Sequence, residues 1–358
     1  MTYKKLPYEG LKAFCTDVYY GYGFPRQESE EIADVILCAD LYGFESHGVQ
    51  RLIRYHKSML EGNIDPKAEP EILFETPISA VIDAKRGAGQ KMALFAMHTA
   101  IEKAQKQGAG FVTMRNANHY GIASYYAMMA AKEKLIGLSF TNSEAMMVPT
   151  YGRNAMLGSN PIAVAMPAKP YVFSFDAATT VIPRGKLEVY EKQEKPLPYG
   201  WAVDVDGLES SDSTRILQNI IHKAGGGILP VGGSDPLNGS HKGYGYGMIC
   251  EIFTSILSGG PTSNHWRRGE TSQGFIAIDY GMFGDKKEIE ERMSQLLEEL
   301  RESDKAEGQT RIYTHGEKEQ ESAKEKQLSG IPVNEKTEGE LREIAAYLKL
   351  DYESYIRN

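Results

Sequence analysis

Residues 45–55 have the sequence Glu-Ser-His-Gly-Val-Gln-Arg-Leu-Ile-Arg-Tyr. Apolar residues recur at helical spacing after Gly48, which predicts a helix there. If this helix already includes His47, then His47 and Arg51 lie on one face, with roughly 5–6 Å between their Cβ atoms. An imidazole that moves a proton beside a guanidinium that clamps a carboxylate suits chemistry on a hydroxy acid. A solvated helix face with an exposed His and Arg would show the same spacing.

The composition is that of an ordinary globular protein. The chain has 358 residues, of which 41% are hydrophobic and 25% charged. This length predicts two or three domains around sizeable cores. The net charge is −8, and basic and acidic residues are mixed along the chain. We therefore expect neither a nucleic acid nor a membrane surface as a partner.

The three cysteines, Cys15, Cys38 and Cys250, are far apart and show no metal-ligand spacing. Neither a HExxH motif nor a Cys/His cluster is present, so no metal site is predicted. No apolar run approaches the length of a membrane span, and the N-terminus has no signal core. Unpaired thiols without a secretion signal indicate a reducing, cytoplasmic location.

Helical and strand patterns are interleaved, which predicts an α/β or α+β fold. Two successive strands around a turn at 167–170 argue against a purely parallel sheet. A last helix, opened by Thr337, needs a partner surface, for which the N-terminal helices are the candidates. We expect an N-terminal helical domain over 1–75, joined by about 318–358, and a mixed-sheet domain over 76–317. Strands are expected at about 80–83, 111–114, 136–140, 162–166, 171–175 and 275–278, and further helices at 90–106, 213–224, 243–258, 286–303 and 317–328.

His119 follows a predicted strand and immediately precedes a predicted helix. The helix dipole at that position disfavours imidazolium, so His119 could be a neutral base near pH 7. The alternative is a loop histidine whose ring caps a turn.

The segment from His241 to Gly245 precedes a helix predicted over 248–257, and it contains Lys242 and Gly243. Free amides at a helix start, glycines and one lysine could bind a pyrophosphate. A lysine that points into water is the alternative. G-x-G-x-x-G after a strand and the P-loop are both missing, which counts against simple Rossmann and phosphoryl-transfer proteins.

Asp176 ends a predicted strand and is followed by Ala177, Ala178 and Thr179. Its carboxylate could accept hydrogen bonds from an amide or a ribose, or it could cap a helix. Asn160 lies in an extended Gly158–Pro161 segment that could present peptide groups to a ligand, or could simply be a turn.

In chain order, these segments resemble the malate/L-lactate dehydrogenase family, which includes ureidoglycolate and diketogulonate dehydrogenases. The resemblance runs from about residue 5 to 350. It implies a non-Rossmann nicotinamide-binding fold, with a helical domain packed on a mixed-sheet domain, and a homodimer. The pieces that carry it are Ser46–Arg51, Asn118–Gly121, Gly158–Ala163, Phe175–Thr180, Arg184–Lys186, Gly227–Pro230, His241–Gly245 and Ile331–Val333.

The resemblance also implies residue roles. His119, or else His47 beside Ser46, matches the proton-transfer histidine, and Arg51 matches the carboxylate clamp. The usual Met after the aspartate is Ala177 here, which leaves the cofactor preference open. The residues expected to contact the cofactor are Ser143, Asn160, Asp176, Ala177, Ala178, Thr179, Lys242, Gly243, His315, Gly316 and Glu317.

We therefore expect an NAD(P)-dependent oxidoreductase that interconverts a small, malate- or lactate-like 2-hydroxy acid and its 2-oxo acid, with NAD slightly favoured over NADP. Within the same class, the alternatives are a ureidoglycolate dehydrogenase and a reductase of a diketo sugar acid or a cyclic imino acid. From another class, the alternative is a non-catalytic dinucleotide-binding protein.

Overall fold

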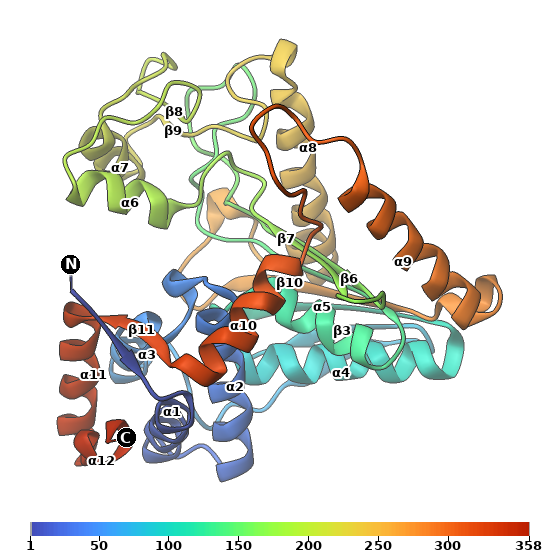
Figure 1. The fold of residues 1–358 in the computed structure, drawn as a ribbon. Coiled ribbons are helices and arrows are strands. Elements are labelled where there is room, and N and C mark those ends of the chain that lie inside the picture. Colours follow the sequence, from blue (N-terminus) through green and yellow to red (C-terminus); the bar gives the residue numbers. More distant parts are fainter. Residues whose placement is uncertain (1, 358) are drawn as a thin grey trace.

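A seven-stranded mixed sheet runs through the middle of the protein (Figure 1). The structure is a computed structural model and describes residues 2–357. In spatial order the strands are β2 (Glu71–Glu75), β3 (Ser79–Asp83), β4 (Ala109–Ala117), β10 (Thr271–Ile278), β5 (Ile136–Thr141), β6 (Ile162–Met166) and β7 (Phe173–Ala177). β3 and β4 run parallel, and the other neighbouring pairs are antiparallel. The mixed sheet confirms the predicted fold class.

Helices cover both faces of the sheet, because successive side chains of a strand point to opposite sides. In β10, Phe275 packs with α4 (Gly89–Gln107) and α5 (Ala123–Lys132) on one face. The next residue, Ile276, packs on the other face with Cys250 of α8 (Ser240–Glu251). A π-helical turn, Ile252–Ile256, extends α8 across the same face.

The two ends of the chain pack together, as expected for the last long helix. Leu341 and Ile344 of that helix share an apolar cluster with Leu11 and Phe14. The first strand also pairs antiparallel with a strand near the C-terminus. The elements involved are β1 (Tyr3–Leu6), α1 (Tyr8–Gly21), α2 (Arg26–Tyr42), α3 (Leu52–Leu60), α10 (Glu317–Ser329), β11 (Ile331–Asn334), α11 (Glu335–Leu348) and α12 (Tyr352–Ile356). The exact domain boundaries stay a prediction.

A separate apolar cluster lies under the part of the chain between β7 and α8. It is built from α6 (Arg184–Lys192), α7 (Ser213–His222), β8 (Ala202–Val203) and β9 (Gly227–Ile228). Figure 1 shows this part above α3 in the view drawn. The remaining long helix is α9 (Lys286–Glu302). None of the helices within residues 2–357 is long and apolar enough to cross a bilayer.

Two predicted helix starts are wrong. α8 begins at Ser240, so Lys242 lies inside its first turn rather than before the helix. α11 begins two residues before Thr337, because Asn334 is its N-cap and accepts a hydrogen bond from the Thr337 N–H at 2.9 Å. Both errors arise at helix ends, where a local side-chain cap or close packing decides the boundary.

Candidate active site

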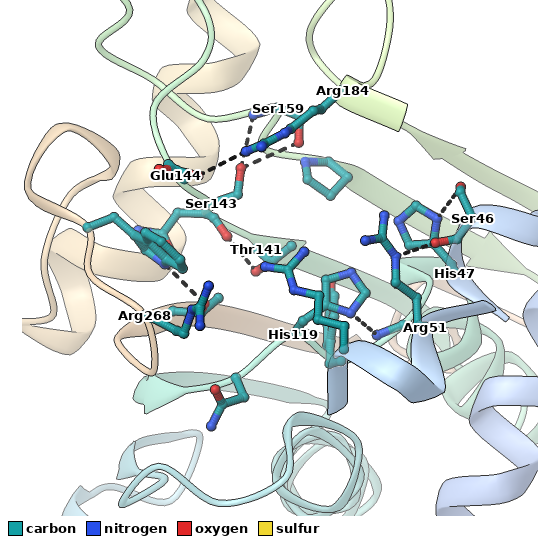
Figure 2. Close-up of a pocket in the computed structure, with 18 of the residues that line it drawn as sticks. Ser46, His47, Arg51, His119, Thr141, Ser143, Glu144, Ser159, Arg184 and Arg268 are labelled. Carbon is teal, nitrogen blue, oxygen red and sulfur yellow. Dashed lines mark hydrogen bonds and ion pairs between the residues drawn. The ribbon is translucent and has the colours of Figure 1, made fainter. Parts of the chain in front are cut away.

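A pocket opens between the 45–55 segment, the loop after β4, the end of β5 and the start of α6 (Figure 2). Five of the residues predicted from sequence line it, namely Ser46, His47, Arg51, His119 and Ser143. Figure 2 shows Ser46, His47 and Arg51 on one wall, with Ser143 and Glu144 across the space from them. The structure therefore brings both predicted histidines and the predicted guanidinium together.

The backbone of the 45–51 segment differs from the predicted continuous helix. It forms two 3-10 turns, Glu45–His47 and Val49–Arg51, which are separated by Gly48 with φ −87° and ψ −144°. The expectation that His47 and Arg51 share one helix face is therefore wrong. They still face one pocket, because the two turns bend around it.

A buried carboxylate fixes this bend. Asp40 of α2 is 3% exposed and accepts a hydrogen bond from the Val49 N–H at 2.8 Å. A Cβ on Gly48 would lie 2.0 Å from Asp40 Oδ1, so a glycine is needed at this close approach. Burial raises the pKa of Asp40 to about 7. Asp40 thus holds the segment that carries His47.

His119 is oriented by a hydrogen bond from α3. The Tyr55 hydroxyl lies 2.7 Å from Nδ1 of His119, which leaves Nε2 as the ring nitrogen available to a ligand. The preceding residue, Asn118, donates from its Nδ2 to the carbonyls of Arg86 and Gly87 at 3.0 Å, which anchors the loop. α5 begins only at Ala123, so the prediction that His119 immediately precedes a helix is wrong.

His47 lies beside His119, and their ring centroids are 5.4 Å apart. The Ser46 hydroxyl lies 2.9 Å from Nδ1 of His47, so Nε2 is again the uncommitted nitrogen. Arg51 donates from its Nε to the Ser46 carbonyl oxygen. This contact leaves the terminal nitrogens of Arg51 available for a bidentate anion.

Both imidazoles are held in their uncharged form. Burial, followed by the charges of Arg51 and Arg54, lowers the pKa of His47 to about 4. The pKa of His119 also falls well below its ordinary value, first through burial and then through His47, Arg51 and Arg54. The predicted direction for His119 is thus observed, but its cause is desolvation and nearby cations rather than a helix dipole.

Four guanidiniums line the pocket, and they differ in their partners. Arg184 pairs with Glu144 and Glu188, each at 3.1 Å, and Arg268 pairs with Glu61 at 2.9 Å. Arg51 and Arg54 have no acidic partner within residues 2–357. The pocket therefore carries uncompensated positive charge.

A hydrogen-bonded band of predicted cofactor residues leads away from the pocket. Ser143 at the pocket wall donates from its N–H to Asn160 Oδ1, at 3.2 Å, and its Oγ accepts from the Ser159 N–H. The Ser159 carbonyl accepts from the Thr179 N–H at 2.9 Å, and the Thr179 carbonyl accepts from the Val231 N–H. Asn160 itself is fully buried. Its side chain accepts from the Ser143 N–H and donates to Glu251 Oε1 at 2.8 Å, so Asn160 ties the band to α8.

The band ends at the N-terminal turn of α8. Gly243 packs on the backbone of Val231, where a Cβ would lie 2.2 Å from the Val231 oxygen. This close packing leaves no room for a side chain at position 243. Lys242 is exposed in the same turn. A helix start with one lysine suits an anion such as a pyrophosphate.

The other predicted cofactor residues lie around β7, outside the pocket lining. Asp176, at the edge of α5, accepts a hydrogen bond from the Ser124 N–H at 2.7 Å, and burial raises its pKa to about 6. It is followed by the partly buried Ala177 and Ala178. The strand continues to Ala177, one residue beyond Asp176, at which it was predicted to end.

The predicted segment His315–Glu317 covers the edge of the sheet. The carbonyl of His315 accepts a hydrogen bond from the Ser174 N–H of β7 at 3.2 Å. A Cβ on Gly316 would lie 2.9 Å from the Ser174 Cβ. Glu317 is fully buried and accepts hydrogen bonds from Thr314 and Arg311. Its carboxylate is therefore already satisfied within the protein.

The donor set fits a nicotinamide dinucleotide. The pocket and the band offer hydroxyls, such as those of Ser143 and Ser159, together with backbone amides, and the α8 start adds a lysine. The hydroxyls suit the carboxamide of a nicotinamide and the backbone amides suit ribose hydroxyls. The lysine at the helix start suits the pyrophosphate. The side-chain oxygen of the buried Gln273 has no partner within residues 2–357. Its amide nitrogen donates to the Asn118 carbonyl, next to His119.

Sequence reasoning missed several residues of the pocket. Tyr55 and Arg54 lie on α3 one turn after Arg51, and their spacing could have indicated a shared face. Trp266 and Arg268 come from a loop before β10, and no local signal in the sequence places them there. They reach the pocket because β10, which follows them, pairs between β4 and β5 in the sheet.

The chain is similar over nearly its whole length to known dehydrogenases. A family model described as malate/L-lactate dehydrogenase matches residues 6–342. Malate dehydrogenase of Pyrococcus abyssi is 41% identical over 348 residues, which cover 96% of this chain and 94% of that protein. L-sulfolactate dehydrogenase of Methanocaldococcus jannaschii is 39% identical over 357 residues, which cover 97% and 98%. The solved structure of malate dehydrogenase from Entamoeba histolytica has a TM-score of 0.94 at 33% identity and covers 98% of this chain and 99% of that one.

The family model and these relatives each span nearly the whole chain. Their names are those of dehydrogenases, which favours an enzyme over the alternative of a non-catalytic binding protein. The chain belongs to the malate/L-lactate dehydrogenase family and is a nicotinamide-dependent oxidoreductase that acts on the CH–OH group of a 2-hydroxy acid.

Proposed function

We propose that Arg51 holds the carboxylate of a malate- or lactate-like 2-hydroxy acid while His119 exchanges the proton of its hydroxyl group. One observation carries this proposal: two uncharged imidazoles and a guanidinium without an acidic partner face the same pocket. An anion clamp beside a neutral base is the combination that hydroxy-acid oxidation needs.

Each residue has a defined task in this proposal. The terminal nitrogens of Arg51 bind the carboxylate, because its Nε is held by the Ser46 carbonyl. Nε2 of His119 takes the hydroxyl proton, because Nδ1 is held by Tyr55. When bound, the nicotinamide cofactor supplies the hydride acceptor for C2. His47, beside Ser46, is the second candidate for the proton transfer.

The electrostatics support a base that works in both directions. In the free pocket, burial first, and then the charges of His47, Arg51 and Arg54, lower the pKa of His119. A substrate carboxylate on Arg51 offsets that positive charge and therefore raises the pKa of His119 again. His119 then takes the proton during oxidation and returns it during reduction of the 2-oxo acid.

For the cofactor, we propose NAD over NADP. The band through Ser143, Asn160 and Thr179 offers neutral groups, with Lys242 and Gly243 at its far end for the pyrophosphate. Asp176, Ala177, Ala178 and the segment His315–Glu317 remain proposed cofactor contacts from the edge of the sheet. Titration of the protein with NADH and NADPH, followed by nicotinamide fluorescence, tests the preference. Tighter binding of NADPH would reverse it.

We also propose a homodimer in a reducing, cytoplasmic compartment. Phe74, Ile256 and Leu257 are 62%, 58% and 53% exposed near an apolar groove on the α8 side of the sheet. Apolar patches of this kind mark contact surfaces, and a second copy of the chain is the occupant we propose. All three cysteines are unpaired, which suits a reducing compartment. Light scattering on the purified protein tests the dimer, and a monomeric mass would exclude it.

The substrate class is tested by a panel of 2-oxo acids, a diketo sugar acid and cyclic imino acids with NADH and NADPH, and by oxidation of ureidoglycolate with NAD+ and NADP+. We expect the highest kcat/KM for a small 2-oxo acid. His119→Ala should abolish most of that activity, whereas His98→Ala, on an exposed face of α4, should leave it unchanged. A higher kcat/KM for a cyclic imine or a ureido acid would replace the proposed substrate class by that alternative.

A further inference from the structure

Arg54 is a cation at the pocket for which the proposed function has no use. It lies on α3 three residues after Arg51, and both side chains line the pocket. Within residues 2–357, its side chain makes no hydrogen bond or ion pair. By contrast, the guanidiniums of Arg184 and Arg268 are each paired with glutamate.

The surroundings of Arg54 disfavour its charge. The side chain of Arg54 lines the pocket but stays exposed to solvent. Partial desolvation there, followed by the charge of Arg51, lowers the pKa of Arg54. The repulsion between the neighbouring, unpaired guanidiniums of Arg51 and Arg54 disfavours the empty pocket modestly, because solvent screens it. An anion bound between Arg51 and Arg54 would offset this repulsion and would bind more tightly for that reason.

We propose that Arg54 binds a second acid group of the substrate, at the end of the chain away from the reacting carbon. This inference rests on the proposed function, in which Arg51 holds the carboxylate next to the CH–OH group. Residues three apart on a helix have roughly 5–6 Å between their Cβ atoms, so the two guanidiniums can hold both ends of one short diacid. The substrate class is then a 2-hydroxy acid with a second carboxylate or a sulfonate.

Two further groups of the pocket lining are already held by partners within the protein. Arg268 also lines the pocket, but Glu61 holds it at 2.9 Å, so its charge is already balanced. Trp266 lines the same side and is fixed by its Nε1–H, which donates to Thr271 Oγ1 at 3.1 Å. Arg54 is therefore the uncommitted donor for a distal acid group.

The test compares Arg54→Gln with wild type, with the full chain and saturating NADH, on three 2-oxo acids. Oxaloacetate and sulfopyruvate carry two acid groups, and pyruvate carries one. We expect Arg54→Gln to lower kcat/KM for both two-acid substrates by about ten- to a hundredfold, the usual effect of losing a hydrogen bond to a charged group. The kcat/KM for pyruvate should change by less than about threefold. Arg54→Lys should restore part of the loss, because it keeps the charge but not the fork.

Lys57→Gln is the matched control, because it removes one positive charge from an exposed position of the same helix. It should leave the ratio of kcat/KM values for oxaloacetate and pyruvate unchanged. Binding of succinate to the NADH-loaded protein, measured by calorimetry, gives a readout without turnover and should also weaken in Arg54→Gln.

The outcomes separate this inference from the proposed function. If Arg54→Gln lowers kcat/KM equally for pyruvate and oxaloacetate, or leaves both unchanged, the distal-acid role of Arg54 is wrong while the dehydrogenase function stands. If wild type reduces none of the three acids, the proposed function fails as well. A loss confined to oxaloacetate and sulfopyruvate, together with weaker succinate binding, supports the inference.

Discussion

The hydroxyl of Tyr55 lies 2.7 Å from Nδ1 of His119, across 64 positions of the chain. This contact joins α3 to the loop after β4. The same helix carries Arg54 and begins directly after Arg51. It fixes the plane of the imidazole relative to the carboxylate clamp. The proposed anion-binding and proton-transfer groups are thus positioned by the same helix.

Replacement of the proposed base should remove turnover and spare cofactor binding. His119→Ala should lower kcat by about 10²- to 10⁴-fold, the usual contribution of a general base. NADH affinity, measured by fluorescence, should stay within about twofold, since His119 is not part of the proposed cofactor band. If His119→Ala keeps full activity while His47→Ala loses it, the two histidines have exchanged roles.

Tyr55→Phe should weaken catalysis without unfolding the protein. The change removes one hydroxyl, whose hydrogen bond contributes ~0.5–1.5 kcal/mol, so kcat should fall roughly two- to tenfold. The matched control is Tyr20→Phe, because Tyr20 is 58% exposed and far from the pocket lining. Equal activity of the Tyr55→Phe variant and wild type would show that ring orientation does not depend on this hydroxyl.

The pH profile should reflect the lowered pKa of His119. Oxidation of the hydroxy acid needs the uncharged imidazole, which is present above that pKa and is lost as the pH falls through it. The pKa lies well below the ordinary 6.5, so kcat/KM for oxidation should stay level through neutral pH and fall only in acid.

The same profile gives a second readout in Arg54→Gln. Loss of one neighbouring cation raises the pKa of His119, so the acid limb should move to higher pH. The assigned electrostatics would be contradicted if the acid limb of the profile moved to lower pH in Arg54→Gln. They would also be contradicted if the acid limb stayed in place in both Arg54→Gln and His119→Asn.

Arg51→Lys should raise KM for the acid substrate about tenfold or more. Lysine keeps the charge but loses the planar fork that binds a carboxylate through two parallel hydrogen bonds. Arg215→Lys, at an exposed position of α7, is the matched control and should leave KM unchanged. Unaltered kinetics of Arg51→Lys would remove Arg51 from the substrate site.

Gly48→Ala should destabilise the segment that carries His47. A Cβ at this position would lie 2.0 Å from Asp40 Oδ1, so the backbone or Asp40 must shift, at a cost of about 1–3 kcal/mol. Thermal unfolding should show a lower Tm and kinetics a lower kcat. Gly339→Ala, a helix position with open space around it, should instead raise Tm slightly. Equal Tm values for wild type and Gly48→Ala would show that the contact is easily relieved.

Local periodicity was enough to predict the long amphipathic elements. α4 and α9 begin and end within about a residue of the expected ranges, because their apolar positions repeat every three to four residues. β1 and β2 could not be predicted in this way. β1 contains two lysines and pairs with β11 more than 300 residues later, and every residue of β2 is exposed, so neither strand shows an alternating pattern.

Within the site, sequence pattern predicted the residues that are close in the chain. Ser46, His47 and Arg51 lie within six positions, and their common pocket follows from that proximity. The Tyr55–His119 contact depends on how α3 packs against the loop after β4, and this packing leaves no local signature. Asp176 shows the same limit, since its Ser124 partner lies 52 positions away on α5.

The most direct test is a crystal structure with NAD and a non-reactive analogue of the 2-hydroxy acid bound. We expect the carboxylate of the analogue on the terminal nitrogens of Arg51, and Nε2 of His119 within hydrogen-bonding distance of the atom that replaces the hydroxyl oxygen. A complex in which the analogue lies away from Arg51, with neither His119 nor His47 facing the nicotinamide, would contradict the account.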